Sequence, residues 1–159
     1  MIQIITATKW IYNNSNKLKI NKEKIYVVEH SSGAHLGGVL LTSDWGKIGL
    51  PNNIIKGATL ISGMYDMYPI RLSLRSKYLY LNDNIEENMS PIRHQIKSSP
   101  QIIISFGSLE SYEFKRQSLD FYNYLKNKIL LQNLLSNNIL IILKSWMTLV
   151  IPIIKLQKK

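Results

Sequence analysis

The sequence predicts an α/β domain in which a parallel sheet is flanked by helices, and three observations predict it. Short apolar, β-rich runs occur at residues 25–28, 54–61 and 101–106, as is typical of strands buried on both faces of a parallel sheet. Serine or glycine residues that favour turns end each run. Helical patterns alternate with the runs, and strands that alternate with helices form parallel sheets.

The first helix is predicted from its apolar spacing. Trp10, Ile11, Asn14 and Leu18 fall on or near one face of a helix over residues 6–18. Asn21 then marks a turn into the first strand.

Two more helices and one long excursion complete the pattern. Residues 34–41 continue as a helix after the first strand, and residues 113–128 repeat apolar positions at helical intervals after the third. Between the second and third strands, residues 65–100 are polar, aromatic and interrupted by prolines. In an open α/β sheet, an excursion at the carboxyl ends of the strands is where ligands bind.

The composition of the chain changes near Lys128. Residues 129–159 contain no Asp, Glu, Gly or His, and the last acidic residue is Asp120. A βα unit normally carries turn glycines and acidic residues at helix starts. We therefore predict a folded domain over residues 1–128 and a divergent apolar, basic tail over residues 129–159.

Charge and cysteine content exclude several classes of protein. The 20 Lys and Arg against 10 Asp and Glu give a net charge of +10, but only four of the basic residues are Arg. Arg reads guanine edges and binds phosphate in a bidentate manner, so its scarcity argues against a nucleic-acid partner. The absence of Cys excludes disulfides, a thiolate nucleophile and Cys-ligated zinc, and it suits a reducing cytoplasm.

We expect neither a signal peptide nor a membrane span. Lys9 and the Asn-rich stretch after it interrupt the apolar start. The most apolar segment, residues 139–154, is divided by Lys144 and Pro152 and is shorter than the roughly 20 residues that a spanning helix needs.

One motif carries chemistry. The segment VVEHSSGAHL at residues 27–36 reads as a strand, a sharp turn at a serine and a helix, which is the context of a G-x-S-x-G nucleophile elbow. Gly33 matches the second glycine of that motif, whereas Glu29 occupies the position of the first. Taken alone, the segment is more typical of a polar turn between strand and helix, capped by Ser31 or Ser32.

Four segments in order carry a more specific resemblance. They are HSSGAHL at 30–36, KGATLISGMYD at 56–66, SPIRH at 90–94, and ESYEFKRQS at 110–118 with Phe121. Together, from about Thr8 to Leu125, they resemble the kynurenine formamidase (arylformamidase) group of α/β-hydrolases, enzymes of tryptophan catabolism. The resemblance implies part of an α/β-hydrolase fold: a parallel sheet flanked by helices with a nucleophile elbow.

The resemblance also implies roles for individual residues. Ser31 would be the nucleophile, the backbone N–H of Ser32 an oxyanion donor, and Glu110 the acid of the triad, in a position where the family usually has Asp. The alternative for Glu110 is a solvated loop charge. Glu113 is expected to be a carboxylate of the first helical turn, and Asp66 is expected to shape the pocket or cap a turn.

Two expected parts are not found. In this fold the order is Ser, then Asp or Glu, then His, yet the three histidines, His30, His35 and His94, all precede Glu110. We expect structural roles for them. A glycine-rich oxyanion loop should precede the elbow, but the first 30 residues contain no Gly. The expectation is a hydrolase truncated at both ends, with impaired activity and an unpaired sheet edge that favours association.

The leading functional hypothesis is a serine hydrolase that cleaves N-formylkynurenine-like formamides through an acyl-enzyme on Ser31. The alternatives are a general carboxylesterase, a non-catalytic remnant, and a basic membrane-surface or nucleic-acid binder that rests only on the charge and the apolar tail. The expected partners are a small-molecule formamide or ester and, through the exposed sheet edge, a second copy. No metal or organic cofactor is implied.

Overall fold

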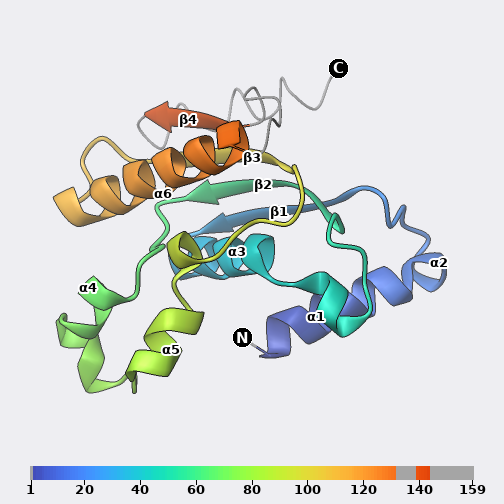
Figure 1. Cartoon of the computed structure of the whole chain (residues 1–159), viewed down its shortest axis with the longest axis horizontal. Coiled ribbons are helices and arrows are strands. Elements are labelled where there is room, and N and C mark those ends of the chain that lie inside the picture. The colour runs from blue at the N-terminus through green and yellow to red at the C-terminus, as the bar shows by residue number, and fades with distance from the viewer. Residues whose placement is uncertain (1, 132–138, 144–159) are drawn as a thin grey trace.

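The computed structural model describes residues 2–131 and 139–143, and it centres on a four-stranded parallel sheet (Figure 1). The strands lie in sequence order: β1 (Ile25–His30), β2 (Ile55–Ile61), β3 (Gln101–Phe106) and β4 (Ile139–Leu143). This confirms the predicted α/β class with a parallel sheet flanked by helices.

The helices fall into three groups. Before β1 come α1 (Ile2–Asn13) and α2 (Ser15–Leu18). Two longer helices follow strands directly, α3 (Ser32–Thr42) after β1 and α6 (Tyr112–Leu131) after β3. Short elements lie between the strands, namely η1 (Trp45–Ile48), α4 (Tyr68–Arg71), η2 (Leu74–Lys77), α5 (Asp83–Asn88) and η3 (Pro91–Arg93). The excursion predicted over residues 65–100 thus contains short helical pieces. It lies on the side toward which the strand arrowheads point in Figure 1, the carboxyl edge of the sheet.

The first helix differs from its prediction over residues 6–18. It begins at Ile2, and the helical stretch is broken at Asn14, whose side chain donates to the Trp10 carbonyl at 2.9 Å. Asn competes for backbone groups in this way and therefore weakens a helix interior. The second piece, α2, ends at Leu18, and the following Lys19 has a left-handed φ of 54° that terminates the helix.

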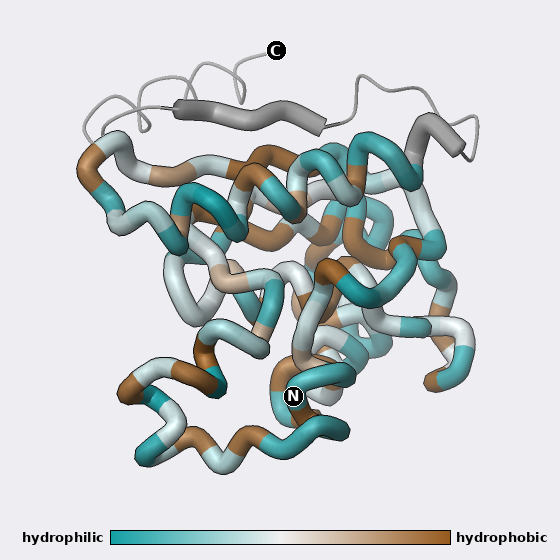
Figure 2. Tube along the Cα trace, turned by 60° about the vertical axis from the view of Figure 1, so that its left-hand side comes forward, coloured by the Kyte–Doolittle hydropathy of each residue, from teal (hydrophilic) through white to brown (hydrophobic). Residues whose placement is uncertain are grey.

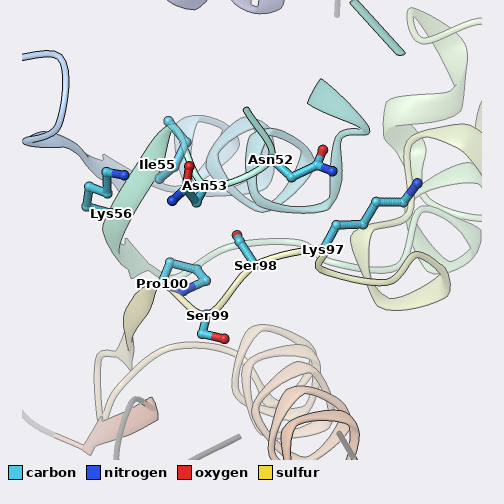
Figure 3. Close-up of a pocket in the computed structure, with 8 residues that line it drawn as sticks. All are labelled: Asn52, Asn53, Ile55, Lys56, Lys97, Ser98, Ser99 and Pro100. Carbon is cyan, nitrogen blue, oxygen red and sulfur yellow. The ribbon is translucent and has the colours of Figure 1, made fainter. Parts of the chain in front are cut away.

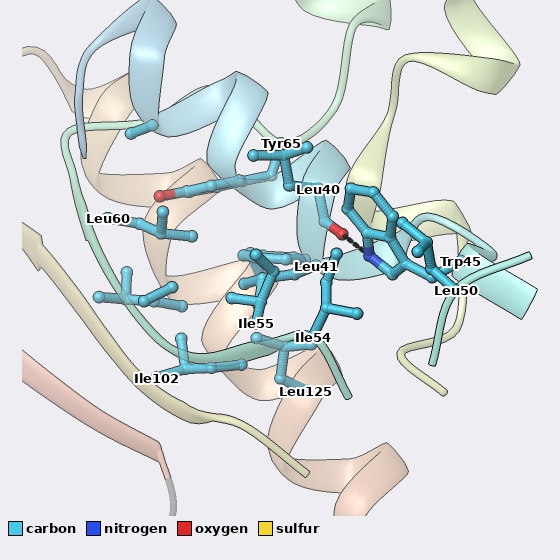
Figure 4. Packing of buried hydrophobic residues seen from close by; sticks show 14 residues of the cluster. Leu40, Leu41, Trp45, Leu50, Ile54, Ile55, Leu60, Tyr65, Ile102 and Leu125 are labelled. Atoms are coloured by element: carbon cyan, nitrogen blue, oxygen red, sulfur yellow. Dashed lines mark hydrogen bonds between the residues drawn. The ribbon is translucent and has the colours of Figure 1, made fainter. Parts of the chain in front are cut away.

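The core lies between one face of the sheet and the helices α3 and α6. Its buried members are Ala34, Leu40, Leu41, Trp45, Leu50, Ile54, Ile55, Ala58, Leu60, Tyr65, Ile102, Ile104, Phe121 and Leu125. Figure 4 shows Leu40 beside Trp45 and Leu41 beside Ile55, with Ile102 of β3 and Leu125 of α6 on the other side of the same cluster. The Trp45 indole N–H donates to the Leu40 carbonyl at 3.0 Å, so the buried ring keeps its polar atom satisfied.

β1 has one exposed face. Val27 and Glu29 are directed at α3, while Tyr26 and Val28 point away from it and are 60% and 63% exposed. Among the described strands, β1 pairs only with β2, so its other edge is open in that part of the chain. Association of copies through this edge stays a prediction.

Apolar residues also occur outside the core. Figure 2 shows them along the strands and their covering helices, and again within the short elements between β2 and β3. In that segment Leu72, Leu74, Tyr78 and Tyr80 are exposed. No helix in the described ranges is long and apolar enough to span a membrane.

The fourth strand lies in the segment predicted to be a divergent tail. β4 continues the sheet in parallel register, from Ile102 opposite Ile139 to Phe106 opposite Leu143. The rest of that segment beyond α6, residues 132–138 and 144–159, lies outside the described residues. The domain boundary at residue 128 therefore stays a prediction.

Candidate active site

Ser31 occupies a strained turn between a strand and a helix. β1 ends at His30, α3 begins at Ser32, and Ser31 has a φ of 56° and a ψ of −121°. A non-glycine residue with positive φ persists only where its surroundings fix it. Here the Ser31 N–H donates to the Ile61 carbonyl at 2.8 Å, and its carbonyl accepts from the His35 N–H at 3.2 Å. The predicted strand, elbow and helix are confirmed.

Glycines let α3 lie close to the sheet. A Cβ on Gly37 would sit 2.6 Å from a methyl carbon of Leu60, and one on Gly33 would collide with the carboxylate of Glu29. The elbow therefore tolerates Glu29 in the place of the first glycine because Gly33 leaves space for that side chain. This gives a physical reason for the departure that the sequence shows.

The amide of Ser32 opens α3. The first N–H groups of a helix have no partner within the helix, and the helix dipole makes this end positive. The position suits an oxyanion donor, because the donor in a nucleophile elbow is the N–H that follows the nucleophile. The role of Ser32 itself stays a prediction.

Glu110 meets a second serine, Ser62, at the neighbouring strand end. The Ser62 hydroxyl donates to Oε1 of Glu110 at 2.5 Å. The other carboxylate oxygen, Oε2, is buried and has no hydrogen-bond partner among the described residues. This contact argues against a purely solvated loop charge and leaves one carboxylate oxygen open to a further donor.

Ser31, Ser62 and the Glu110 loop lie along one edge of the sheet. β1, β2 and β3 run parallel, with His30 opposite Ile61 and Ile61 opposite Ser105. Ser31 follows β1, and the loop to Glu110 follows β3, so both stand at the carboxyl ends of their strands. The predicted placement of Ser31 and Glu110 at the same edge is confirmed.

Two of the histidines are held by main-chain carbonyls. Nε2 of the buried His35 lies 2.7 Å from the Met89 carbonyl, and Nε2 of His94 lies 2.7 Å from the Glu87 carbonyl. His30 ends β1 beside Ser31 and is exposed. Since Oε2 of Glu110 accepts no hydrogen bond within the described part, neither His35 nor His94 donates to that oxygen.

His35 makes stability depend on pH. Burial lowers the pKa of His35 below its ordinary value of 6.5, and this outweighs the opposing effect of the Met89 carbonyl. The folded state therefore prefers the neutral ring, a preference fully present above the unfolded pKa and lost as pH falls through 6.5 toward the lower folded value. We expect the free energy of unfolding to decline over this range. Urea unfolding at a series of pH values would measure this decline. The variant His35→Gln should show a weaker decline. An unchanged decline in that variant would contradict the assignment of this pH dependence to His35.

The remaining motif residues tie the excursion to α6. Oε1 of Gln117 accepts from the N–H groups of Tyr65 and Asp66 at 2.6 and 2.9 Å, and Nε2 of Gln117 donates to Glu113 at 2.9 Å. Glu113 lies in the first turn of α6, as predicted, and the Arg116 guanidinium lowers its pKa. The motifs that are distant in sequence thus meet in space.

Asp66 caps a turn, which is one of the two roles predicted for it. Its Oδ1 accepts from the Tyr68 N–H at 3.1 Å and from Arg93 Nη2 at 2.9 Å. Arg93 also binds Glu86 at 2.9 Å and Glu87 at 3.0 Å, and these carboxylates raise its pKa. Through Arg93, the segment at residues 90–94 therefore joins the start of the excursion at Asp66 to Glu86 and Glu87.

A polar pocket lies at the opposite edge of the sheet. It is lined by residues before and at the start of β2 and by residues before β3: Asn52, Asn53, Ile55, Lys56, Lys97, Ser98, Ser99 and Pro100 (Figure 3). Both lysines are paired, Lys56 with Glu23 at 2.9 Å and Lys97 with Asp44 at 2.5 Å. No group of three or more His, Cys, Asp or Glu that could hold a metal occurs in the described residues.

Comparison with known proteins identifies relatives of part of the chain. No family model matches the sequence. The kynurenine formamidases of Salmo salar and Danio rerio are each 33% identical over 108 residues, which cover 65% of this chain and 36% of each relative. The chain thus spans about a third of the length of these curated relatives.

Solved structures share the architecture. A thioesterase-like protein from Silicibacter sp. TM1040, described as putative, matches with a TM-score of 0.62 at 17% identity over 87% of this chain and 49% of its own. Thermogutta terrifontis esterase 2, phosphoramylated by tabun, matches with a TM-score of 0.63 at 17% identity over 88% of this chain and 50% of its own. At this identity the likeness shows the fold alone.

Proposed function

We propose that this chain, an arylformamidase-like α/β-hydrolase that holds part of that fold, carries the nucleophile and the acid of a serine hydrolase of arylformamidase type. The observation that carries the proposal is the placement, at one edge of the sheet, of the strained Ser31 and of Glu110, whose Oε2 is buried and has no donor among the described residues. The substrate class is an N-formyl aromatic amine such as N-formylkynurenine.

The proposed chemistry is acyl transfer. The Ser31 hydroxyl oxygen attacks the formyl carbon while its proton passes to a base, and the Ser32 N–H stabilises the oxyanion. The amine leaves with that proton, and water then attacks the formyl ester to release formate and restore Ser31. The base in such a triad is an imidazole whose second nitrogen donates to the acid, and Oε2 of Glu110 is the atom suited to accept from it.

A general carboxylesterase is the second candidate. It uses the same elbow, and the solved neighbours include proteins described as an esterase and an arylesterase. A non-catalytic remnant is the third candidate, and it is favoured because Oε2 of Glu110 accepts no hydrogen bond from the described residues. A cytoplasmic location is inferred from the lack of Cys alone.

Covalent labelling tests the proposal. We expect a fluorophosphonate to modify Ser31 slowly, with fluoride leaving as the oxygen–phosphorus bond forms, and added imidazole to accelerate the reaction by supplying the base. Mass spectrometry of the peptide from residues 25–47 would locate the adduct. Ser31→Ala should abolish it and Glu110→Gln should weaken the imidazole effect. Labelling elsewhere, or equal labelling in Ser31→Ala, would contradict the proposal.

A further inference from the structure

We infer that Ser62 is a positioning residue that fixes the carboxylate of Glu110, so that one oxygen is occupied and the other remains available to the catalytic base. This inference rests on the proposed function, in which Glu110 is the acid. It concerns a residue that the sequence marks only as part of the turn after the second strand.

The backbone holds Ser62 at a defined place between two strands. Ser62 follows β2, and its N–H donates to the Ser105 carbonyl of β3 at 2.7 Å. Its φ is 53°, a conformation that glycine or asparagine adopts at lower cost than serine. A serine in such a position indicates that its hydroxyl contributes something that glycine would not.

The hydroxyl contacts Glu110 directly and out of solvent. Ser62 is 3% exposed, and its Oγ donates to Oε1 of Glu110 at 2.5 Å. A hydrogen bond to an ionised acceptor is stronger and shorter than one between neutral groups. The contact joins the end of β2 to the loop after β3, and it therefore fixes the direction of the carboxylate.

The loop that carries Glu110 offers no competing donor in the described chain. The Glu110 N–H closes a turn on the Gly107 carbonyl at 3.2 Å, and the nearby Lys115 donates to the Ser108 carbonyl at 2.5 Å. No ion pair to Glu110 occurs among the described residues. Ser62 is thus the donor that orients this carboxylate, and Oε2 is left buried and open.

Burying a carboxylate oxygen that accepts no hydrogen bond costs free energy, and a donor that binds it removes that cost. With Oε1 held by Ser62, an imidazole N–H that enters this site has one oxygen to bind. The expected consequence is a single orientation of the base relative to Ser31. Misplacement of a catalytic group by about 1 Å can cost on the order of 100-fold in rate.

Matched glycine variants test the inference. Ser62→Gly removes the hydroxyl and relieves the positive φ; Ser31→Gly makes the same change at the neighbouring strand end. The carboxyl ¹³C resonance of Glu110, assigned by its loss in Glu110→Gln, reports the environment of the carboxylate. We expect Ser62→Gly to move this resonance toward that of solvent-exposed glutamates without lowering the urea midpoint, and Ser31→Gly to leave it in place.

Two results for the Glu110 resonance overturn the inference: an unchanged resonance in Ser62→Gly, or an equal movement in both variants. If imidazole accelerates labelling of Ser31 in the unaltered chain, Ser62→Gly should reduce that acceleration about 10- to 100-fold, and an unchanged acceleration also overturns it. If Ser31 is never labelled, the proposed function fails, and the Glu110 resonance then decides on its own whether Ser62 fixes the carboxylate.

Discussion

The purified chain is expected to turn over N-formylkynurenine and p-nitrophenyl acetate at rates little above the uncatalysed reaction. A serine hydroxyl is a weak nucleophile unless an adjacent base takes its proton. His35 and His94 are each held at a main-chain carbonyl, and Oε2 of Glu110 receives no donor from the described residues. Loss of the histidine alone costs on the order of 10⁶ in kcat in a serine protease triad.

The assay needs Ser31→Ala as its control. The unaltered chain and this variant share every background reaction that does not use the Ser31 hydroxyl. Strong turnover that disappears in Ser31→Ala would contradict the expectation. It would show that His30, His35, His94 or a second chain supplies the base. Separate His→Ala variants would then identify which of the three histidines contributes.

The strands and the elbow could be predicted because local signals agree there. The β-rich run before Ser31, the glycine at 33 and the apolar helix that follows all favour one conformation. The position of Glu110 required the family resemblance, since a lone carboxylate in a polar loop has no local pattern. Its meeting with Ser62 depends on strand register, which single-sequence patterns do not contain.

Helix limits were less predictable, for physical reasons that the structure shows. The helix is interrupted at Asn14, whose φ of −100° and ψ of 15° depart from helical values, and the spacing of apolar residues does not indicate this break. β4 lies in a segment whose composition lacks turn glycines and acidic helix starts, which argued against a further βα unit. Parallel pairing with β3 places a strand there nonetheless.

The ion pairs within the excursion at residues 65–100 could not be predicted from the sequence either. Glu86 is buried, yet it accepts from both Arg71 and Arg93, at 3.1 and 2.9 Å. A buried carboxylate needs such partners. The charges of residues 66–93 look like an ordinary polar surface in the sequence, because the pairing joins residues that only the folded excursion brings together.

The largest stability effect is expected on the inner face of α6. Leu125 is 2% exposed in the core, whereas Leu119, on the same helix, is 40% exposed. Removing a buried leucine side chain costs its transfer free energy and that of the cavity left behind, so Leu125→Ala should lower the free energy of unfolding by about 2–5 kcal/mol. Leu119→Ala, the same substitution with the same gain in helix propensity, should lower it by about 1 kcal/mol or less.

Urea unfolding of the two leucine variants beside the unaltered chain measures this difference. The comparison is sharp because residue type, helix and substitution are shared, and burial is what differs. A larger loss from Leu119→Ala would mean that α6 presents its other face to the sheet. Gln117 on this helix accepts from the N–H groups of Tyr65 and Asp66 and donates to Glu113. Such a result would therefore also contradict the contact that joins α6 to the excursion.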